Sequence, residues 1–288
     1  MKTFSRSATG PSLGSRTLTL VFLVAFTMYC LLPATWLLFA STKNTGDLYG
    51  SFGFWFSNFN LFENLNRLAT YQGGIYLRWL LNSLIYAGLG GLLSTIISAM
   101  AGFALAKYQF AGRELIFSII LGGVLIPSAV LALPLFLLLS QIGLTNNYLG
   151  VLLPSLVSPF GVYLSRVYAA GSVPDELLEA ARVDGSSELR TFFTMVTRLM
   201  GPALVTAFLF QFVAIWNNFF LPLVVLSRNE LFPVTLGLYA WQGQSLGNPD
   251  IVSLVITGSL VASLPLIILF FSLQSYWRAG AATGAVKG

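Results

Sequence analysis

Charged residues are scarce in this sequence. Asp, Glu, Lys and Arg together make up 9% of its 288 residues, whereas hydrophobic residues make up 56%. Ordinary soluble domains carry about 25% charged residues, so this chain lacks the polar surface that would cover it in water. The composition therefore argues against one or two soluble domains and indicates an integral membrane protein.

Histidine is absent, and cysteine occurs once. Without histidine the chain lacks the commonest general base and the commonest transition-metal ligand. No nucleophile–base pair and no cluster of metal ligands is visible among the other residues. Cys30 lies alone in an apolar run, so an intrachain disulfide is impossible. We therefore expect no catalytic residue, no metal site and no cofactor bound by this chain.

Two hallmarks of energy-driven transport are also missing. A P-loop needs Gly-Lys-Ser or Gly-Lys-Thr at the start of a helix, and the only Lys followed by Ser or Thr is Lys2. No Asp, Glu or Lys lies in the middle of an apolar run, where ion-coupled transporters place an ionisable group. Any dependence on ATP must therefore come from another subunit.

Basic residues exceed acidic ones, giving a net charge of +5, but they flank apolar runs and are not interleaved with aromatic residues. Nucleic acid is therefore not an expected partner. Such flanking charges are typical of membrane topology determinants.

Six apolar runs are long enough to span a membrane as helices, since about 20 helical residues cross the hydrocarbon core. The first is too long for the core of a signal peptide, which is about 7–15 residues. We predict an all-α, polytopic membrane protein with six transmembrane helices. The predicted spans are 18–40, 80–106, 115–139, 148–170, 203–226 and 251–276.

Small residues and prolines recur inside these runs. Small residues at four-residue intervals let helix backbones approach closely in lipid, and the second run carries two such series. Prolines inside a span predict kinks. The first series is Ala87, Gly91 and Thr95, the second is Ser94, Ser98 and Gly102, and the prolines are Pro127, Pro134, Pro154, Pro159 and Pro265.

The positive-inside rule orients the helices, because Lys and Arg are enriched in cytoplasmic loops. With both termini inside, eleven of the fifteen basic residues are cytoplasmic and four are outside. We predict cytoplasmic tails at 1–17 and 279–288 and a six-helix domain at 18–278. Within the domain, 41–79 and 227–250 are outer segments, and 172–198 is a cytoplasmic loop between spans four and five.

This cytoplasmic loop holds five of the ten acidic residues of the chain, between Asp175 and Glu188. Ser172 is a candidate N-cap, and Pro174 suits a first helical turn. Gly185 is well placed to end the helix. The loop therefore predicts one short helix with carboxylates at the positive end of its dipole.

The predicted helix is amphipathic. Leu177, Leu178 and Ala181 share one face, and Glu179 can pair with Arg182 across one turn. A helix lying on the inner leaflet is the alternative. It is disfavoured because leaflet-binding helices usually have a basic polar face, and this one is acidic.

Glu179-Ala180-Ala181, followed by Asp184-Gly185, resembles the EAA loop of permease subunits of bacterial ABC importers. The wider stretch, Val-Pro-Asp-Glu-Leu-Leu-Glu-Ala-Ala-Arg-Val-Asp-Gly at 173–185, resembles the form found in carbohydrate importers of the maltose-transporter type. The likeness covers nearly the whole chain. The tail 280–288 resembles the C-terminus of the second permease subunit of that type.

One departure from the family pattern lies beyond the loop. The family usually places a Leu-Pro pair where this sequence has Thr197-Arg198, and Gly201-Pro202 follows slightly later. We therefore expect the helix break before the fifth span to lie about one turn further on.

The resemblance implies a type I ABC importer fold in the bacterial cytoplasmic membrane, with the short helix acting as a coupling helix in a groove of an ATPase. By resemblance, Glu179 makes a polar or ionic contact with the ATPase, and Ala180 and Ala181 allow close approach. Asp184 lies at the position that the motif gives it, directly before Gly185. Gly185 permits the turn that ends the helix.

The implied partners are a second, different permease subunit, two copies of a cytoplasmic ABC ATPase that hold ATP and Mg, an extracytoplasmic solute-binding protein, and membrane lipid. The implied function is non-catalytic. The chain would form half of the translocation pathway for a sugar or oligosaccharide.

Gln211, Trp216, Asn217 and Asn218 supply the aromatic and amide groups that sugar sites combine. Packing or interfacial anchoring explains these four residues equally well. The outer segment 239–249 is a candidate contact for the solute-binding protein. An importer permease for another solute, a membrane-embedded enzyme and a structural membrane subunit are the alternatives, and the sequence does not identify the solute.

Overall fold

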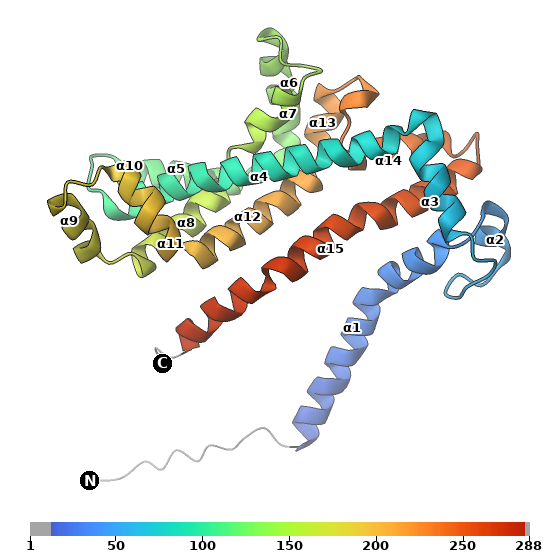
Figure 1. The fold of residues 1–288 in the computed structure, drawn as a ribbon, viewed down its shortest axis with the longest axis horizontal. Coiled ribbons are helices and arrows are strands. Elements are labelled where there is room, and N and C mark those ends of the chain that lie inside the picture. Colours follow the sequence, from blue (N-terminus) through green and yellow to red (C-terminus); the bar gives the residue numbers. More distant parts are fainter. Residues whose placement is uncertain (1–12, 286–288) are drawn as a thin grey trace.

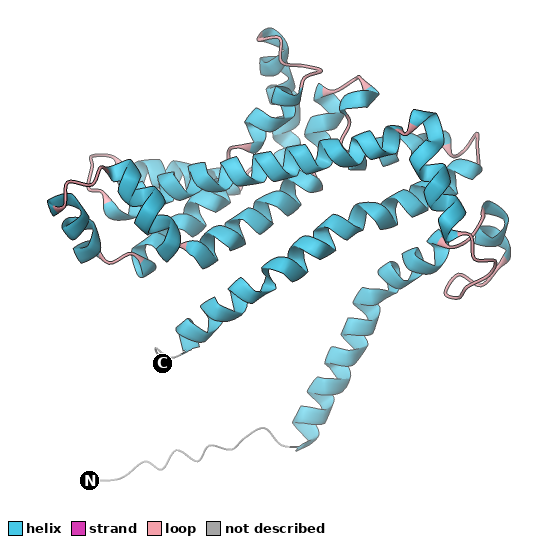
Figure 2. Ribbon diagram, viewed as in Figure 1, coloured by secondary structure: helices cyan, strands magenta, loops and turns pink. Residues whose placement is uncertain are grey.

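The computed structural model describes the backbone of residues 13–285 and the side chains of 14–276. This range is helical and contains no strand, as predicted (Figure 2). Most of the predicted tail 1–17 and the last residues of the predicted tail 279–288 lie outside the described residues. The part of that second tail up to Ala285 continues the last helix.

The elements follow one another along the chain without long unstructured connections. Elements labelled η are short 3₁₀ segments, except η2, which is a π-helix. In order they are α1 Leu13–Ser41, α2 Thr45–Gly50, α3 Leu61–Thr70, η1 Tyr71–Gly73, α4 Ile75–Lys107, α5 Arg113–Val124, α6 Ser128–Gln141, α7 Tyr148–Ser155, α8 Pro159–Ser172, α9 Asp175–Val183, α10 Glu188–Thr191, η2 Phe192–Val196, α11 Thr197–Leu199, α12 Gly201–Trp216, α13 Phe220–Val225, η3 Asn229–Leu231, α14 Val234–Gln244 and α15 Asp250–Ala285.

Four helical stretches within the described residues are long and apolar enough to cross a membrane, and one of them contains the short interruption between α7 and α8. They are Gly14–Ser41, Ile75–Lys107, Tyr148–Ser172 and Asp250–Tyr276. Two further stretches qualify as bent pairs, one formed by α5 and α6 and one in which α12 follows α10–α11. Counting each bent pair as one span gives six, in the predicted order.

The third predicted span, 115–139, is not one straight helix. It breaks between α5 and α6, whose axes differ by 103°. Pro127 stands at the break and caps α6 with an extended backbone. Proline lacks an N–H and disfavours helical geometry in the residue before it, so the helix cannot run through this point. The kink predicted at Pro127 is therefore a complete break, after which the chain runs in a new direction.

The fifth predicted span, 203–226, is also wrong as a single helix. α12 ends at Trp216, and α13 begins at Phe220 after an irregular segment. Pro222 explains the break, because its ring would clash with the carbonyl of Asn218 if the helix continued. The sixteen residues of α12 are about 24 Å long at 1.5 Å per residue.

Helix α4 starts earlier than predicted, at Ile75, and so takes in part of the expected outer segment 41–79. Gly74 precedes it with a φ of 80°, a left-handed conformation that glycine adopts without steric penalty. Helices α2 and α3, the short η1 and an irregular stretch at 51–60 make up most of the rest of that segment.

The centre of the molecule is α4, which runs along its length with α8 and α12 beside it (Figure 1). The two small-residue series on α4 make these contacts. Gly91 lies against the backbone of Phe212 on α12, and Gly102 lies against Ser165 and Arg166 on α8. The predicted close helix packing is confirmed, one series for each neighbour.

Two buried apolar clusters lie along α4. The larger includes Trp79, Trp241 and Val234, near the end that carries α2 and α3. The smaller is formed by residues that include Phe103, Val173, Leu178, Phe192 and Met200. It lies at the opposite end of α4, beside α9, and we call it the α9 cluster. Figure 1 shows α9 at the left extreme of the molecule and α2–α3 at the right.

Candidate functional site: the α9 helix and a cavity at three helix breaks

Helix α9 begins without a side-chain cap. Pro174 occupies the capping position, and the Ser172 hydroxyl donates instead to the carbonyl oxygen of Tyr168 at 2.6 Å. The predicted Ser172 cap is therefore wrong, because that residue still belongs to the last turn of α8. Asp175 and Glu176 do lie in the first turn, where their carboxylates favour the positive end of the helix dipole.

The other end of α9 is closed by Gly185, as predicted. Gly185 has a φ of 74°. Its N–H donates to the carbonyl of Arg182 at 3.0 Å, and the N–H of Ser186 donates to the carbonyl of Ala181 at 2.9 Å. This pair of bonds is the Schellman motif, which satisfies helix-end carbonyls through a left-handed residue.

The inner face of α9 joins it to the membrane helices. Leu178 and Ala181 are buried, and Leu178 packs in the α9 cluster with Phe103 of α4 and Phe192 of η2. Leu177 does not share this buried face. It stays exposed and borders a hollow of about 310 Å³, between α9 and the segment 186–195.

Polar contacts add to this attachment at both ends of α9. Lys107 Nζ, at the end of α4, lies 2.8 Å from Asp175 Oδ1. Arg182 Nε donates to Glu188 Oε1 at 2.9 Å, and the Tyr108 hydroxyl donates to the other oxygen of Glu188. Because Arg182 turns towards Glu188, the predicted Glu179–Arg182 pair is wrong. We call Tyr108, Arg182 and Glu188 the α9 clamp.

Electrostatics within the clamp reinforce its geometry. The Arg182 guanidinium carbon lies 5.8 Å from the centre of the Tyr108 ring. Burial, followed by the hydrogen bond to Glu188, raises the pKa of Tyr108 to about 12, so its hydroxyl stays a donor. The hydrogen bond that Arg182 donates to Glu188 raises the pKa of Arg182 above its usual value.

The rest of α9 is exposed. Glu179 is exposed and Val183 is 88% exposed, while Ala180 and Asp184 are exposed at the hollow that Leu177 also borders. Within the described residues, no hydrogen bond or ion pair involves the carboxylate of Glu179. We call Glu179, Ala180 and Val183 the exposed α9 face.

The helix break before α12 falls at Met200, where α10–α11 and α12 meet at 87°. Thr197 and Arg198 are still helical, and Gly201-Pro202 open α12. The break therefore lies beyond the Thr197-Arg198 position, as predicted.

A cavity lies where three predicted spans are interrupted, between α5 and α6, between α7 and α8, and between α12 and α13. One part has a volume of about 360 Å³ and is lined by residues that include Ser128, Pro154, Gln211, Asn217 and Asn218. An adjoining part of about 370 Å³ shares Ser128, Pro154 and Asn218 with it. We call the two parts the three-break cavity.

The structure gathers three of the four predicted pathway residues at this cavity. Gln211 and Asn217 line it and donate through their amide nitrogens to the carbonyls of Ser155, at 3.1 Å, and Val213, at 2.9 Å. Asn218 lines it as well. Trp216 lies apart from them, 2% exposed and stacked on Phe212 with ring centres 5.6 Å apart.

Ser128 and Pro154 also line the cavity, and neither is a site residue predicted from the sequence. The prolines Pro127, Pro154 and Pro159 predict kinks in these spans. Nothing in the sequence showed that these kinks meet in space.

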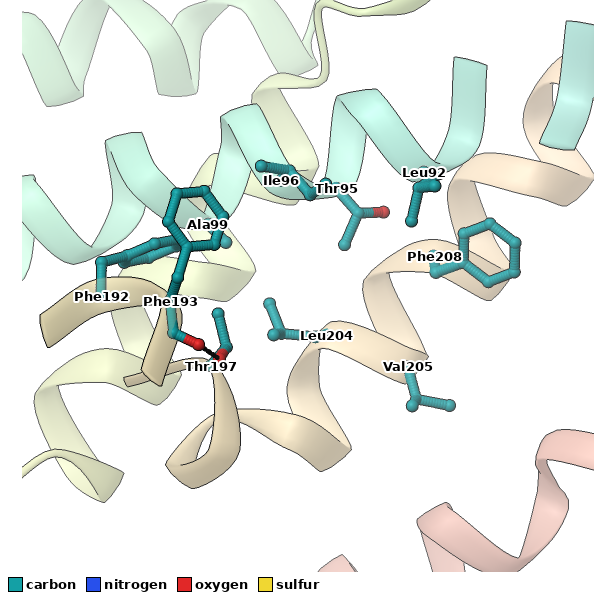
Figure 3. Close-up of a pocket in the computed structure, with 10 residues that line it drawn as sticks. All are labelled: Leu92, Thr95, Ile96, Ala99, Phe192, Phe193, Thr197, Leu204, Val205 and Phe208. Carbon is teal, nitrogen blue, oxygen red and sulfur yellow. Dashed lines mark hydrogen bonds between the residues drawn. The ribbon is translucent and has the colours of Figure 1, made fainter. Parts of the chain in front are cut away.

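A second hollow, between α4, η2 and α12, differs in character (Figure 3). Its volume is about 260 Å³, and most of its lining residues are apolar. Its two hydroxyl groups are already engaged, since Thr95 donates to the Gly91 carbonyl and Thr197 to the Phe193 carbonyl. It therefore offers little to a polar ligand.

The segment 239–249, predicted to lie outside, is on α14 and the turn after it. Tyr239 is exposed and packs edge-on against Phe219, with ring centres 4.8 Å apart. Trp241 is buried in the larger core cluster, while Leu246 is 96% exposed. Only part of this segment is therefore accessible to another protein.

Comparison with known proteins gives consistent matches over most of the chain. Residues 94–280 match the family described as binding-protein-dependent transport system inner membrane component. The arabinooligosaccharides transport system permease protein AraQ of Bacillus subtilis is 37% identical over 279 residues, 94% of this chain and 95% of that protein. AraQ of Halalkalibacterium halodurans is 40% identical over 217 residues, 75% of this chain and 76% of that protein.

Two further similarities extend across most of the chain. The lactose transport system permease protein LacG of Rhizobium radiobacter is 30% identical over 256 residues, 88% of this chain and 90% of that protein. A solved structure of a bacterial ABC transporter involved in importing the acidic polysaccharide alginate has a TM-score of 0.78 at 23% identity, covering 93% of this chain and 99% of that one. The chain therefore has the type I importer fold and belongs to the family of binding-protein-dependent transport system inner membrane components, the permeases of ABC importers.

Proposed function

We propose that this chain is the permease subunit of an ATP-driven importer and forms half of the translocation pathway for a sugar or oligosaccharide. The observation that carries the proposal is the similarity to AraQ of Bacillus subtilis, which extends over 94% of the chain and whose name specifies arabinooligosaccharide transport. The similarity to LacG supports a carbohydrate rather than an amino acid, phosphate or polyamine.

In this proposal the exposed α9 face binds a separate cytoplasmic ATPase. Two copies of that ATPase hold ATP and Mg, a second, different permease completes the pathway, and a solute-binding protein delivers the sugar from outside. The attachment of α9 supports this role. Because the α9 cluster and clamp join α9 to α4 and η2, displacement of α9 would move the membrane helices, as alternating access requires.

The proposed topology has both termini and α9 in the cytoplasm. The excess of basic residues predicted for that side supports it. So does the course of α15, whose C-terminal end lies on the same side of the molecule as α9 (Figure 1).

Substitution of Glu179 by Lys tests the coupling role. The carboxylate has no partner within the described residues, so the variant should fold and insert normally while losing its contact with the ATPase. Sugar uptake by cells that express the complete importer should fall to background, with unchanged amounts of protein in the membrane. Glu63→Lys, at an exposed position of α3, is the matched control and should transport normally.

Normal uptake by Glu179→Lys would contradict the coupling role. Purification of the chain separates the remaining alternatives. Recovery without any P-loop ATPase would favour a membrane enzyme or structural subunit. Binding measurements on the cognate solute-binding protein, across a panel of sugars and other solutes, would identify the solute.

A further inference from the structure

We infer that the three-break cavity is a subsite within this chain for an uncharged sugar, which it holds through Ser128, Asn218 and the amide oxygens of Gln211 and Asn217. The inference rests on the proposed function and extends it, because it assigns both the place of contact and the charge class of the solute.

The first argument is the position of the breaks. Each of the three interruptions, at 125–127, 156–158 and 217–219, falls inside a predicted span. In the hydrocarbon region, non-helical backbone is tolerated only where protein buries it or where it lines a water-filled cavity. Here all three breaks border the same cavity. Interrupted helices that meet at one point are a recurring construction of solute sites in transporters.

The second argument is the hydrogen-bonding capacity of the lining. Ser128 Oγ and the side-chain amide of Asn218 have no hydrogen bond to another described residue. The amide nitrogens of Gln211 and Asn217 are engaged by backbone carbonyls, which leaves their oxygens as acceptors. A sugar hydroxyl both donates and accepts, so this mixed set suits a polyol.

The third argument is the absence of charge. No Asp, Glu, Lys or Arg lines either part of the cavity within the described residues. A sugar carboxylate placed there would lose its hydration without gaining a countercharge, which is strongly unfavourable in a membrane interior. The cavity therefore favours neutral sugars, in contrast to the acidic polysaccharide named for the structurally similar transporter.

Shape and apolar lining agree with this assignment. The two parts, of about 360 and 370 Å³, lie within the range of about 300–1,000 Å³ that is usual for ligand pockets. Phe220, Pro154 and Val157 border both parts and supply apolar surface for the C–H faces of a sugar ring. The hollow of Figure 3 has comparable size but lacks free polar groups.

The test uses the complete importer in proteoliposomes, with its binding protein and a radiolabelled neutral arabinose trisaccharide as the probe. Ser128→Ala and Asn218→Ala remove polar groups that make no hydrogen bond to another described residue. Each should lower the ratio of sugar transported to ATP hydrolysed by about three- to tenfold, the effect of one lost hydrogen bond. Asn218→Ser should recover part of the loss, and Asn66→Ala, at an exposed position of α3, should have no effect.

The ratio of sugar transported to ATP hydrolysed distinguishes a failure of this inference from a failure of the proposed function. Variants that keep ATP hydrolysis stimulated by the binding protein but transport less sugar support the subsite. An unchanged ratio in the Ser128→Ala/Asn218→Ala double variant overturns the subsite and leaves the importer intact. Failure of the unmodified complex to couple ATP hydrolysis to uptake of any sugar overturns both.

A binding experiment tests the charge class. Purified complex in nanodiscs is incubated with the labelled arabinose trisaccharide and challenged with an unlabelled neutral trisaccharide or a trisaccharide of uronic acids. The neutral competitor should displace the label, and the acidic one should not. Equal displacement by both would overturn the assignment to uncharged sugars.

Discussion

Gly185 determines how α9 ends. Its left-handed backbone, with φ at 74°, allows the two N–H groups of Gly185 and Ser186 to reach the carbonyls of the last turn. A Cβ added at this position would meet no atom within 4 Å. Any effect of a substitution would therefore come from backbone strain and not from a clash.

Replacement of Gly185 by Ala should open the C-terminal turn of α9, because a left-handed conformation costs about 1–2 kcal/mol in an ordinary L-residue. Uptake should fall severalfold, and limited proteolysis at 183–187 should become faster. Gly185→Asn should behave much more like the native protein, since Asn tolerates this conformation. Gly171→Ala, at an unstrained and open position of α8, controls for the added methyl group, and equal behaviour of all three variants would contradict the prediction.

The α9 clamp shows what local sequence patterns miss. Spacing along a helix predicted that Arg182 pairs with Glu179, three residues before it. Arg182 instead pairs with Glu188, which also accepts a hydrogen bond from Tyr108, eighty residues away in sequence. A pair three residues apart on an exposed helix is worth only about 0.2–0.5 kcal/mol, so a second donor is enough to redirect the arginine. Sequence alone gives no sign of such a meeting.

At the level of elements, α4 is the scaffold on which the site is built. Its neighbour α8 approaches so closely at Gly102 that an added Cβ would have no room. A Cβ on Gly102 would lie 2.5 Å from Ser165 Cβ and 2.6 Å from the Arg166 nitrogen. Because part of this contact is backbone, α8 would have to move as a unit. α8 leads directly into α9, so the packing of α4 and α8 also positions the exposed α9 face.

Gly102→Ala should therefore destabilise the protein, by about 1–3 kcal/mol as for other overpacked cores. Thermal unfolding of the purified chain in detergent should show a lower midpoint. Gly88→Ala lies on the same helix, where an added Cβ meets nothing within 4 Å, and should leave the midpoint unchanged or slightly raised. Equal midpoints for the two variants would mean that α4 and α8 separate more readily than the structure indicates.

The sequence predicted the number and order of spans but not their shape. The length of an apolar segment indicates whether it can cross the membrane. It does not indicate whether the helix axis changes direction within the segment, so 115–139 and 203–226 were each predicted as one continuous helix. Pro127 predicts a bend but not an angle of 103° between the axes of α5 and α6, because that angle depends on the elements against which α6 packs. Chemical type alone makes the four pathway residues candidates. Packing separates Trp216, which the core buries, from the three that face the cavity.

Taken as a whole, the chain is uneven in how deeply its spans are buried. Half of the residues in the most apolar window of α4 are buried, whereas no residue in the corresponding window of α1 is buried and 17% of those in the window of α15 are. Helices that surround a pathway normally cover one another, so this pattern leaves apolar surface for lipid and for another subunit. It fits a chain that supplies half of a pathway.

The two ends of the molecule are expected on opposite sides of the membrane, which cysteine labelling can test. Cys30 is the single cysteine, so a Cys30→Ser background is free of competing thiols. Val183→Cys and Leu246→Cys introduce thiols at positions that are 88% and 96% exposed.

A membrane-impermeant maleimide should label Leu246→Cys in intact spheroplasts and Val183→Cys only in inside-out vesicles. Bound ATPase should slow the second reaction, because Val183 lies on the exposed α9 face. Labelling of Val183→Cys in intact spheroplasts would place α9 outside, where no cytoplasmic ATPase could reach it.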